Sequence, residues 1–489
     1  MNGVYELLEK LLNYDYYFTD IYDIDKTSTL YLPDLDMYEV PDIETRIASS
    51  CYQLVSSSTQ LRMRVQPFDN TFAGPSYHNW PMIIPPETYQ ETHPKWFATH
   101  ATVTQLCYTA KGDAAELAAL QAASVEVMYD WLMEYPDRNI VHMGMADDHN
   151  WCQCTACDTD KKTYGSYSAS LVKFFNGCAA LLKDKLVEAN DPRVDLFKIS
   201  FFAYFDVEDA PVTIEKDVNG NYVYQDGKIV CHYADEMKMD EHVVPFYAPY
   251  YADYTQDFYS EANKDYLDAL IGWDAIADSL IVWTYDQYYF NYAVPYNSFA
   301  ATQSLFKALK EVGVSWHYVE GQMGQRTPIS FSSFKSYLNS KYGWDVDEDY
   351  ADLKYRFFKA MYGSEYETIL RVFDEFCLTM KRANTELGLS TVVGTSALYE
   401  REYWPKNLLA SWISTMEDSM AKLKAEGKDK LADNVRVESL NFIYLMLKVH
   451  GSLMTTEDYQ YYKALLVKNS KGTHILRPDM SAFIQELDG

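Results

Sequence analysis

The sequence predicts an α/β fold, a TIM (β/α)8 barrel followed by an α-helical C-terminal domain. From Pro41 to Gly321, short apolar runs alternate with amphipathic helical patterns, which is typical of a βα architecture. About seven strand candidates lie in this range, close to the eight that a TIM barrel needs. Beyond Trp344 the strand pattern stops and helical periodicity continues. A doubly wound open sheet is the alternative.

The predicted elements follow one another in the order that such a barrel requires. The strand candidates are the apolar runs at residues 43–51, 61–65, 139–145, 196–204, 243–247, 280–283 and 314–319. Apolar residues at helical spacing predict helices, the first of them with Asp113 as its N-cap, over 114–134, 166–186, 264–277 and 298–312. Residues 212–233 alternate around Asn-Gly and Asp-Gly pairs, which predicts a β-hairpin inserted on the barrel. The C-terminal helices are expected at 350–361, 365–386, 407–424 and 434–449.

Composition and charge exclude several classes of function. The chain has 489 residues, 48% of them apolar, and its 71 acidic and 42 basic residues give a net charge of −29. This charge repels phosphate backbones and anionic lipid surfaces, so we expect no nucleic-acid partner. No apolar run in the sequence approaches the roughly 18 residues that a membrane span needs, so we expect no membrane insertion.

Tyrosine is unusually abundant. The 43 Tyr outnumber all Lys and Arg together, and with 10 Trp they supply many rings that carry a polar tip. Such rings suit neutral polyhydroxylated ligands, which favours an oligosaccharide or the glycan of a glycoprotein as substrate. The alternative is that these tyrosines are ordinary core and surface residues.

Polar and aromatic side chains follow the predicted strands, where the active site of a TIM barrel lies. Asp147 and Asp148 follow the run that ends at Met145. Tyr204 follows the next run and Glu320 the last. Glycoside hydrolysis needs carboxylates that transfer protons and rings that stack on sugars, so we expect a sugar site that also includes His78, Trp283, Tyr285, Asp286, Tyr292, Asn297 and Trp316. For any single carboxylate, the alternative is a helix N-cap or a solvated loop charge.

The adjacent acids Asp147 and Asp148 support a sharper hypothesis. Neighbouring residues after a strand point in different directions, so one can face the leaving group while the other reaches another part of the sugar. This arrangement suits substrate-assisted cleavage of an N-acetylhexosamine, in which the acetamido oxygen of the substrate is the nucleophile. We assign Asp148 as general acid and base and Asp147 as the carboxylate that orients the acetamide, with the reverse assignment as the alternative.

Five stretches of the chain carry a family resemblance: NGVYELLEKLL near the start, PPETYQETHPKWFA with QLCYT (85–109), MADDHNWCQCTAC (145–157), VWTYDQYYFNYAVPYNSF (282–299) and YLNSKYGWDVDEDYADLKYRFFKAMYG (337–363). They resemble glycoside hydrolase family 163, which contains endo-β-N-acetylglucosaminidases acting on complex N-glycans, and the bacterial domains of unknown function related to it. The resemblance implies a barrel with a C-terminal helical domain. It also places Asp147 in the strand-end acid motif of the family, whereas many relatives carry a residue other than Asp at position 148.

The resemblance and the patterns together predict three regions. Residues 1–40 are expected to be the remnant of a small N-terminal α/β domain with a linker, as the resemblance implies. The barrel is expected over 41–335, with the hairpin insertion at 212–233, and the α-helical domain over 336–489.

Three cysteines lie close together in the sequence, at Cys152, Cys154 and Cys157. Thiolates at this spacing can share one zinc ion. A fourth ligand is not obvious, although His149 and Asp158 are near, and the second pair of cysteines expected of a zinc ribbon is missing from the sequence. We therefore expect no metal and no organic cofactor, and a loop shaped by these cysteines, with a disulfide if the protein is exported.

These observations predict a glycosidase that cleaves β-linked N-acetylglucosamine with retention, by endo action on complex N-glycans. The alternatives are an exo-acting or uronic-acid-directed glycosidase on the same barrel, and a sugar-binding barrel without turnover. The chain as given carries no export signal, and we expect the full-length form to be secreted, periplasmic or on the cell surface.

Overall fold

Seven parallel strands form one sheet in the computed structural model, in the order β3-β13-β12-β11-β6-β5-β4. The structure describes residues 2–18, 21–26, 34, 36, 38–47, 57–66, 71–288, 291, 293–321, 331–395, 398 and 400–471. The strands of the sheet are β3 (Thr45–Ile47), β4 (Phe72–Ala73), β5 (Ile140–His142), β6 (Lys198–Ala203), β11 (Val243–Tyr247), β12 (Ile281–Tyr285) and β13 (Trp316–Glu320).

The sheet curls, and its two ends approach each other across the interior. The ring of Phe72 on β4, at one edge, lies 5.7 Å from that of Trp316 on β13, next to the other edge. Beyond β3 a single parallel bridge joins Ile47 to Gln66. Within the described residues, no strand pairing connects this bridge to β4. The structure therefore shows a curled seven-stranded sheet, and it does not show the closed barrel that the sequence predicted.

Aromatic side chains fill the inside of the curl in layers. The rings of Phe202, Phe246 and Trp283 on three adjacent strands have centroids 5.3 to 5.8 Å apart. Tyr318 on the next strand continues this layer, 4.5 Å from Trp283. Because side chains alternate between the two faces of a strand, each interior residue has its neighbours two positions away. Phe202, Trp283 and Tyr318 of this layer line a cavity at the carboxyl ends of the strands, whereas Phe72 contacts Trp316 at the amino-terminal end, which we call the base.

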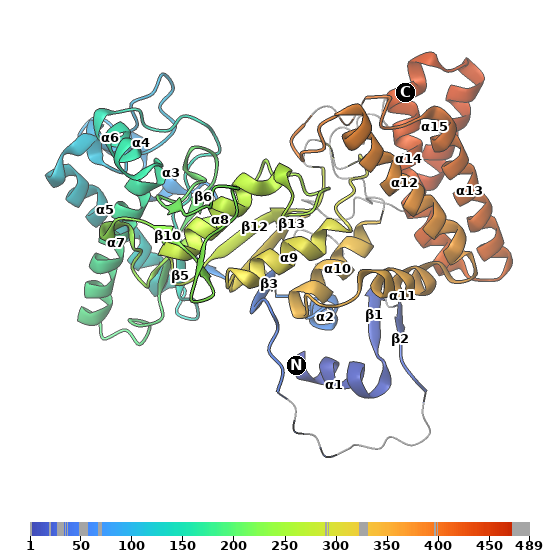
Figure 1. The fold of residues 1–489 in the computed structure, drawn as a ribbon, viewed down its shortest axis with the longest axis horizontal. Helices are drawn as coiled ribbons and strands as arrows, with labels where there is room; N and C mark the ends of the chain where they lie inside the picture. Colours follow the sequence, from blue (N-terminus) through green and yellow to red (C-terminus); the bar gives the residue numbers. More distant parts are fainter. Residues whose placement is uncertain are drawn as a thin grey trace.

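Helices cover the outside of the sheet at the places that the apolar spacing predicts. They are α5 (Ala114–Glu134), α7 (Ser168–Glu188), α8 (Lys264–Ile276) and α9 (Ala301–Glu311). Asp113 caps α5 as expected, since its side chain accepts hydrogen bonds from the amides of Ala115 and Glu116. Shorter helices are α3 (Trp80–Ile83), α4 (Pro86–Tyr89) and α6 (Thr155–Tyr164), and α2 (Ser57–Arg62), which lies apart from them beside α10 (Ser332–Trp344; Figure 1).

Helices follow the sheet in the C-terminal region; the last four lie at one end of the long axis of the molecule, and the first two lie closer to its middle (Figure 1). This region consists of α10 (Ser332–Trp344), α11 (Tyr350–Tyr362), α12 (Tyr366–Leu387), α13 (Lys406–Ala425), α14 (Asp429–His450) and α15 (Thr456–Ser470). Its contact with the sheet side includes Asn291, whose amide donates to the hydroxyl of Tyr444 on α14. No helix among the described residues combines the length and apolarity needed to cross a bilayer.

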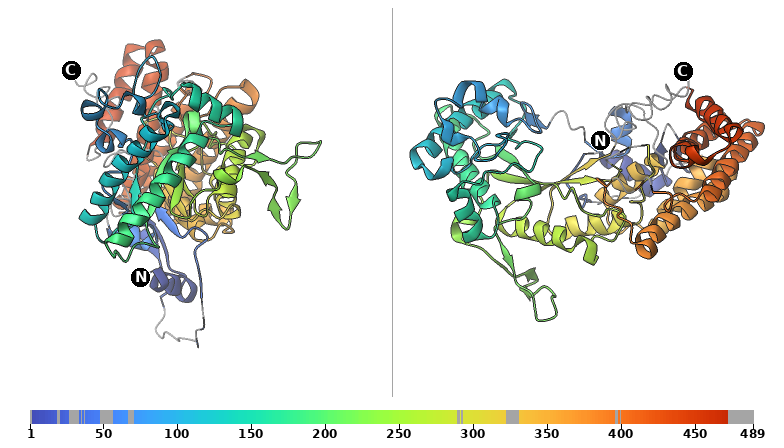
Figure 2. Two further views of the ribbon diagram at one scale, coloured as in Figure 1. Left: turned by 90° about the vertical axis from the view of Figure 1, so that its left-hand side faces the viewer. Right: turned by 90° about the horizontal axis from the view of Figure 1, so that it is seen from above.

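Two smaller units extend from the body. At the start of the chain, α1 (Asn2–Leu12) is followed by the antiparallel pair β1 (Asp15–Phe18) and β2 (Ile21–Asp23), which lies under α10 and α11 in Figure 1. The 212–233 segment forms two antiparallel ladders and projects away from the sheet (Figure 2), with strands β7 (Thr213–Ile214), β8 (Tyr224–Gln225), β9 (Lys228–Ile229) and β10 (Cys231–His232).

One predicted strand is wrong. Residues 61–65 were expected to extend, but Leu61 and Arg62 end helix α2, and the nearest strand contact is the bridge at Gln66. The alternation of Leu61, Met63 and Val65 is too short to tell a strand from a helical turn followed by a bend. Met63 and Val65 are buried, which accounts for their apolar character without a strand.

Candidate functional site

A cavity of about 490 Å³ opens at the carboxyl ends of the strands. Seven of the predicted site residues line it, namely His78, Asp147, Asp148, Tyr204, Trp283, Tyr285 and Glu320. The remaining lining residues are Tyr77, His149, Phe202, Phe205, Ala248, Tyr250, Tyr251 and Tyr318. The cavity therefore combines carboxylates, imidazoles and aromatic rings in the place where α/β sheets bind their ligands.

One wall of the cavity belongs to β12 and β13; we call Trp283, Tyr285, Tyr318 and Glu320 the strand wall. Parallel pairing sets Trp283 beside Tyr318 and Tyr285 beside Glu320. The Trp283 indole donates a hydrogen bond of 3.0 Å to Oε2 of Glu320. All four side chains are at most 8% exposed. The strand wall is thus rigid, with a carboxylate held against an indole.

A second wall comes from the segments that follow β5, β6 and β11, and it meets the strand wall where the rings of Tyr250 and Tyr285 lie 5.3 Å apart. We call it the loop wall; it consists of Asp147, Asp148, His149, Tyr204, Phe205, Tyr250 and Tyr251. The Tyr204 hydroxyl donates to Oδ1 of Asp147 at 3.0 Å. It also lies 3.5 Å from Nδ1 of His78, which is 2.7 Å from the carbonyl of Met145. Asp147 is exposed to the cavity, whereas its neighbour Asp148 is half-buried.

Asp148 is held by a set of donors. The Gln105 amide donates to Oδ1 of Asp148 at 3.0 Å, and so does the backbone amide of Asn150 at 2.9 Å. Burial raises the pKa of Asp148, but hydrogen bonds from Thr104, Asn150 and Gln105 outweigh it and lower the pKa below its usual value. The same Gln105 side chain accepts from the amide of Ala146 and donates to its carbonyl. Gln105 therefore fixes both ends of the short segment that carries Asp147.

His149 and Asp206 lie at the edge of the loop wall. Nδ1 of His149 is 3.6 Å from Oδ2 of Asp206, and Nε2 is 3.4 Å from the hydroxyl of Tyr251. The pKa of Asp206 is raised by burial, against the opposing effect of His149. A carboxyl group with a raised pKa and an imidazole therefore lie side by side next to the cavity.

Of the predicted site residues that the structure describes, three do not line the cavity, namely Asp286, Asn297 and Trp316. Tyr292 lies outside the described residues. Asp286 is buried and accepts a hydrogen bond of 2.8 Å from Asn339 of α10. Asn297 donates to the carbonyl of Cys377, and Trp316 packs against Phe72 at the base. Asp286 follows the interior residue Tyr285 directly, so strand alternation directs its side chain to the other face.

Several lining residues were missed by sequence reasoning. Tyr318 could have been found, because Trp316, Tyr318 and Glu320 are spaced by two and share one face of their strand. Tyr77 adopts a positive φ of 92°, which the sequence does not reveal. Phe205, with a φ of 53°, also leaves its strand in a left-handed conformation.

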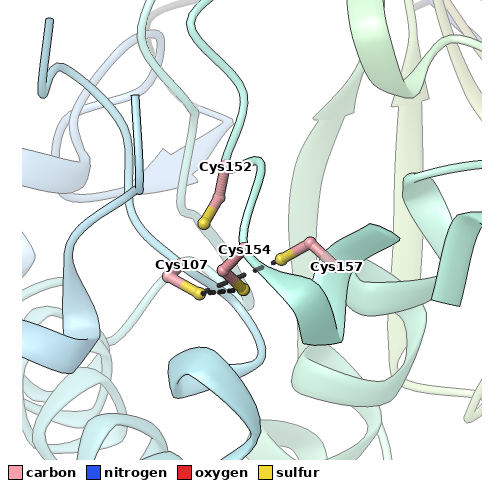
Figure 3. A group of neighbouring side chains, drawn as sticks. All are labelled: Cys107, Cys152, Cys154 and Cys157. Atoms are coloured by element: carbon pink, nitrogen blue, oxygen red, sulfur yellow. Dashed lines mark hydrogen bonds between the residues drawn. The ribbon is translucent and has the colours of Figure 1, made fainter. Parts of the chain in front are cut away.

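A fourth cysteine joins the three that are close in sequence. Cys107, Cys152, Cys154 and Cys157 are all buried, and their sulfur atoms all lie within 4.8 Å of one another (Figure 3). Cys107 is far from the others in sequence, so no local spacing could have indicated it. The fourth sulfur, which was not obvious from the sequence, is therefore that of Cys107, and neither His149 nor Asp158 belongs to the cluster.

The fold and the site define a parallel α/β protein with a helical C-terminal region and an acidic, aromatic cavity at its strand ends. The chain belongs to the family described as Domain of unknown function (DUF4838), whose model matches residues 16–374. This agrees with the predicted resemblance to bacterial domains of unknown function. The match runs from β1 into α12, so it includes every strand of the sheet and the whole cavity. A search of curated proteins found no match.

Proposed function

We propose that the protein is a glycoside hydrolase that cleaves β-linked N-acetylglucosamine in glycans, with retention and by a substrate-assisted mechanism. The observation that carries the proposal is the meeting of two walls in one cavity. The loop wall presents Asp147 and Asp148, and the strand wall presents buried rings with Glu320. Carboxylates that transfer protons and aromatic faces that stack on sugars are the components that glycosidic cleavage requires, and both line this cavity.

The hydrogen bonds support the alternative division of labour between the two acids. Asp148 has a lowered pKa, which suits a carboxylate that stays ionised and accepts the acetamide N–H of the substrate. Asp147 is the more exposed of the two acids and lines the cavity, which suits a residue that gives a proton to the leaving oxygen and later takes one from water. The acetamido oxygen attacks the anomeric carbon, the glycosidic bond breaks, and water then opens the oxazolinium intermediate.

Two finer features belong to the same proposal. The curled sheet is the main part of a TIM barrel whose ring is completed between its β3 and β4 edges. The substrate is a complex N-glycan cleaved by endo action, as the resemblance to glycoside hydrolase family 163 implies.

The test is incubation of the purified protein with a glycoprotein that carries complex N-glycans, followed by mass analysis of both products. We expect a released oligosaccharide and a protein that keeps one N-acetylglucosamine. Release of single sugars would replace endo by exo action. Binding without any release, with Asp147→Asn binding equally well, would leave a sugar-binding protein instead of an enzyme.

A further inference from the structure

The four-cysteine cluster connects two segments that are distant in sequence. Cys107 directly follows Leu106, which forms an antiparallel bridge with Phe97. Cys152 and Cys154 belong to the loop after β5, and Cys157 lies in the first turn of α6. Figure 3 shows the four side chains converging from these segments, with the sulfurs directed toward a common centre. The cluster lies outside the cavity lining.

The sulfur distances fit one tetrahedral ion. Sγ of Cys107 is 3.7 Å from Sγ of Cys154 and 3.9 Å from Sγ of Cys157. Four thiolates bound at about 2.3 Å around one zinc ion are separated from each other by about 3.8 Å. A disulfide would bring two sulfurs to about 2.05 Å, and the four cysteines are free thiols in this structure.

The surroundings of the sulfurs suit thiolates. The backbone amides of Lys111 and Thr99 point at the sulfurs of Cys107 and Cys152, each at 3.2 Å. The Thr109 hydroxyl is 3.3 Å from the sulfurs of both Cys107 and Cys157. Such donors around metal-bound sulfur orient the ligands and offset their negative charge.

Apolar packing around the four cysteines is sparse. It forms a small core separate from the main one, and the only other buried apolar residue in it among the described part of the chain is Ala98. Ala156 and Tyr167 cover it from outside. Four thiols and one methyl group bury little apolar area, so hydrophobic packing alone stabilises this junction weakly.

We propose that Cys107, Cys152, Cys154 and Cys157 bind one structural zinc ion. Four protein ligands close the coordination sphere, which is typical of structural sites and leaves no position for a substrate. Tetrahedral sulfur coordination selects zinc over the harder ions, and sulfurs within 4.8 Å of one another leave room for a single ion rather than an iron–sulfur cubane.

The ion fastens the loop wall to the body. Cys107 is two residues from Gln105, whose side chain holds Asp148 and both backbone groups of Ala146. Cys152 lies four residues beyond Asp148 on the same loop. A zinc ion that binds both segments would therefore hold Gln105 in position to donate its hydrogen bond to Asp148. This role concerns structure and is independent of the reaction proposed above.

The test is elemental analysis of the full chain, purified without chelator and without added metal. We expect about one zinc per chain in the wild type, and loss of most of it in Cys107→Ser and in Cys154→Ser. Cys178→Ser is the matched control, because Cys178 is a buried thiol in α7 outside the cluster and its substitution should leave the zinc content unchanged.

A second measurement uses the wild type alone, in case the serine variants fail to fold. Titration with a mercurial reagent should release one zinc as four thiols react, and cobalt exchanged into the site should show the visible absorption of tetrahedral cobalt thiolate. Four outcomes would overturn the proposal: protein without zinc, iron in place of zinc, a disulfide between any two of the four cysteines, or zinc retained in both serine variants. Zinc content is read without any activity assay, so failure of the glycosidase proposal does not affect this outcome.

Discussion

The strand wall and the loop wall of the cavity are built by different means. Trp283, Tyr285, Tyr318 and Glu320 are side chains of paired strands and are at most 8% exposed. In the loop wall, Asp147 is exposed and Tyr251 is 43% exposed. Strand pairing and packing hold the first wall, whereas hydrogen bonds from Gln105 and Asn150 hold the segment of the second wall that carries the two acids. Substitutions should therefore affect folding first in the strand wall and chemistry first in the loop wall.

The largest effect is expected in the loop wall, at Asp147. Asp147→Asn should lower turnover of a natural glycan by about 10²–10⁴-fold, because the general acid is lost, with little change in the free energy of unfolding. An activated aryl glycoside, which departs without protonation, should be affected much less. Asp137→Asn, at the exposed turn before β5, is the control. If turnover of the natural glycan and of the aryl glycoside falls equally, Asp148 rather than Asp147 is the general acid.

In the strand wall, Trp283→Ala should lower the free energy of unfolding by about 3–5 kcal/mol. The indole packs against Phe246 and Tyr318 and donates to Glu320, so its removal leaves a cavity and a buried carboxylate without that donor. Chemical denaturation measures the loss, and Trp283→Phe should restore most of it. An unchanged denaturation midpoint with weaker substrate binding would show that the ring serves the ligand alone.

Two buried histidines on strands below the two walls should make the free energy of unfolding depend on pH. Nδ1 of His142 on β5 contacts the Ser200 hydroxyl, and Nε2 of His317 on β13 contacts that of Thr284, each at 2.7 Å. Burial lowers the pKa of each histidine to about 3. The ordinary pKa of histidine is about 6.5, so between about pH 6.5 and pH 3 the unfolded chain binds more protons than the folded chain. The free energy of unfolding therefore falls as the pH falls through this window.

Urea unfolding at several pH values within that window measures this dependence. His317→Gln should flatten the slope, and the exposed His232→Gln should not change it. A slope that is the same in wild type and His317→Gln would mean that His317 titrates normally in the folded protein.

The smallest effect is expected at the rim of the loop wall. Tyr251→Ala should weaken sugar binding by about 1 kcal/mol, roughly fivefold, by removing a stacking face. Because the side chain is 43% exposed, the free energy of unfolding should change by no more than about 0.5 kcal/mol. Isothermal titration with an oligosaccharide measures the first quantity. Tyr251→Phe keeps the ring, so it should bind nearly as well unless the contact between the hydroxyl and His149 matters.

Local periodicity by itself determined most of the helices and strands. The predicted strand at 243–247 is β11, and the predicted helix at 114–134 is α5 with Asp113 as its cap. The position of Asp147 and Asp148 after a strand was also readable, because a βα unit places such residues at the carboxyl edge of the sheet. These features depend on residues within a few positions of each other, and the chain itself carries that information.

Tertiary structure decided which strand-end residues meet. Asp286 follows a strand as plausibly as Glu320 does, and Trp316 shares the strand face of Glu320, yet alternation turns Asp286 toward α10 and Trp316 contacts Phe72 at the base. The partners Gln105 and Cys107 reach the acid loop from about 40 residues upstream, at a distance that no sequence period encodes. Such contacts arise when the curled sheet brings separate segments together. Only the folded chain therefore shows that Gln105 and Cys107 contact the loop that carries the two acids.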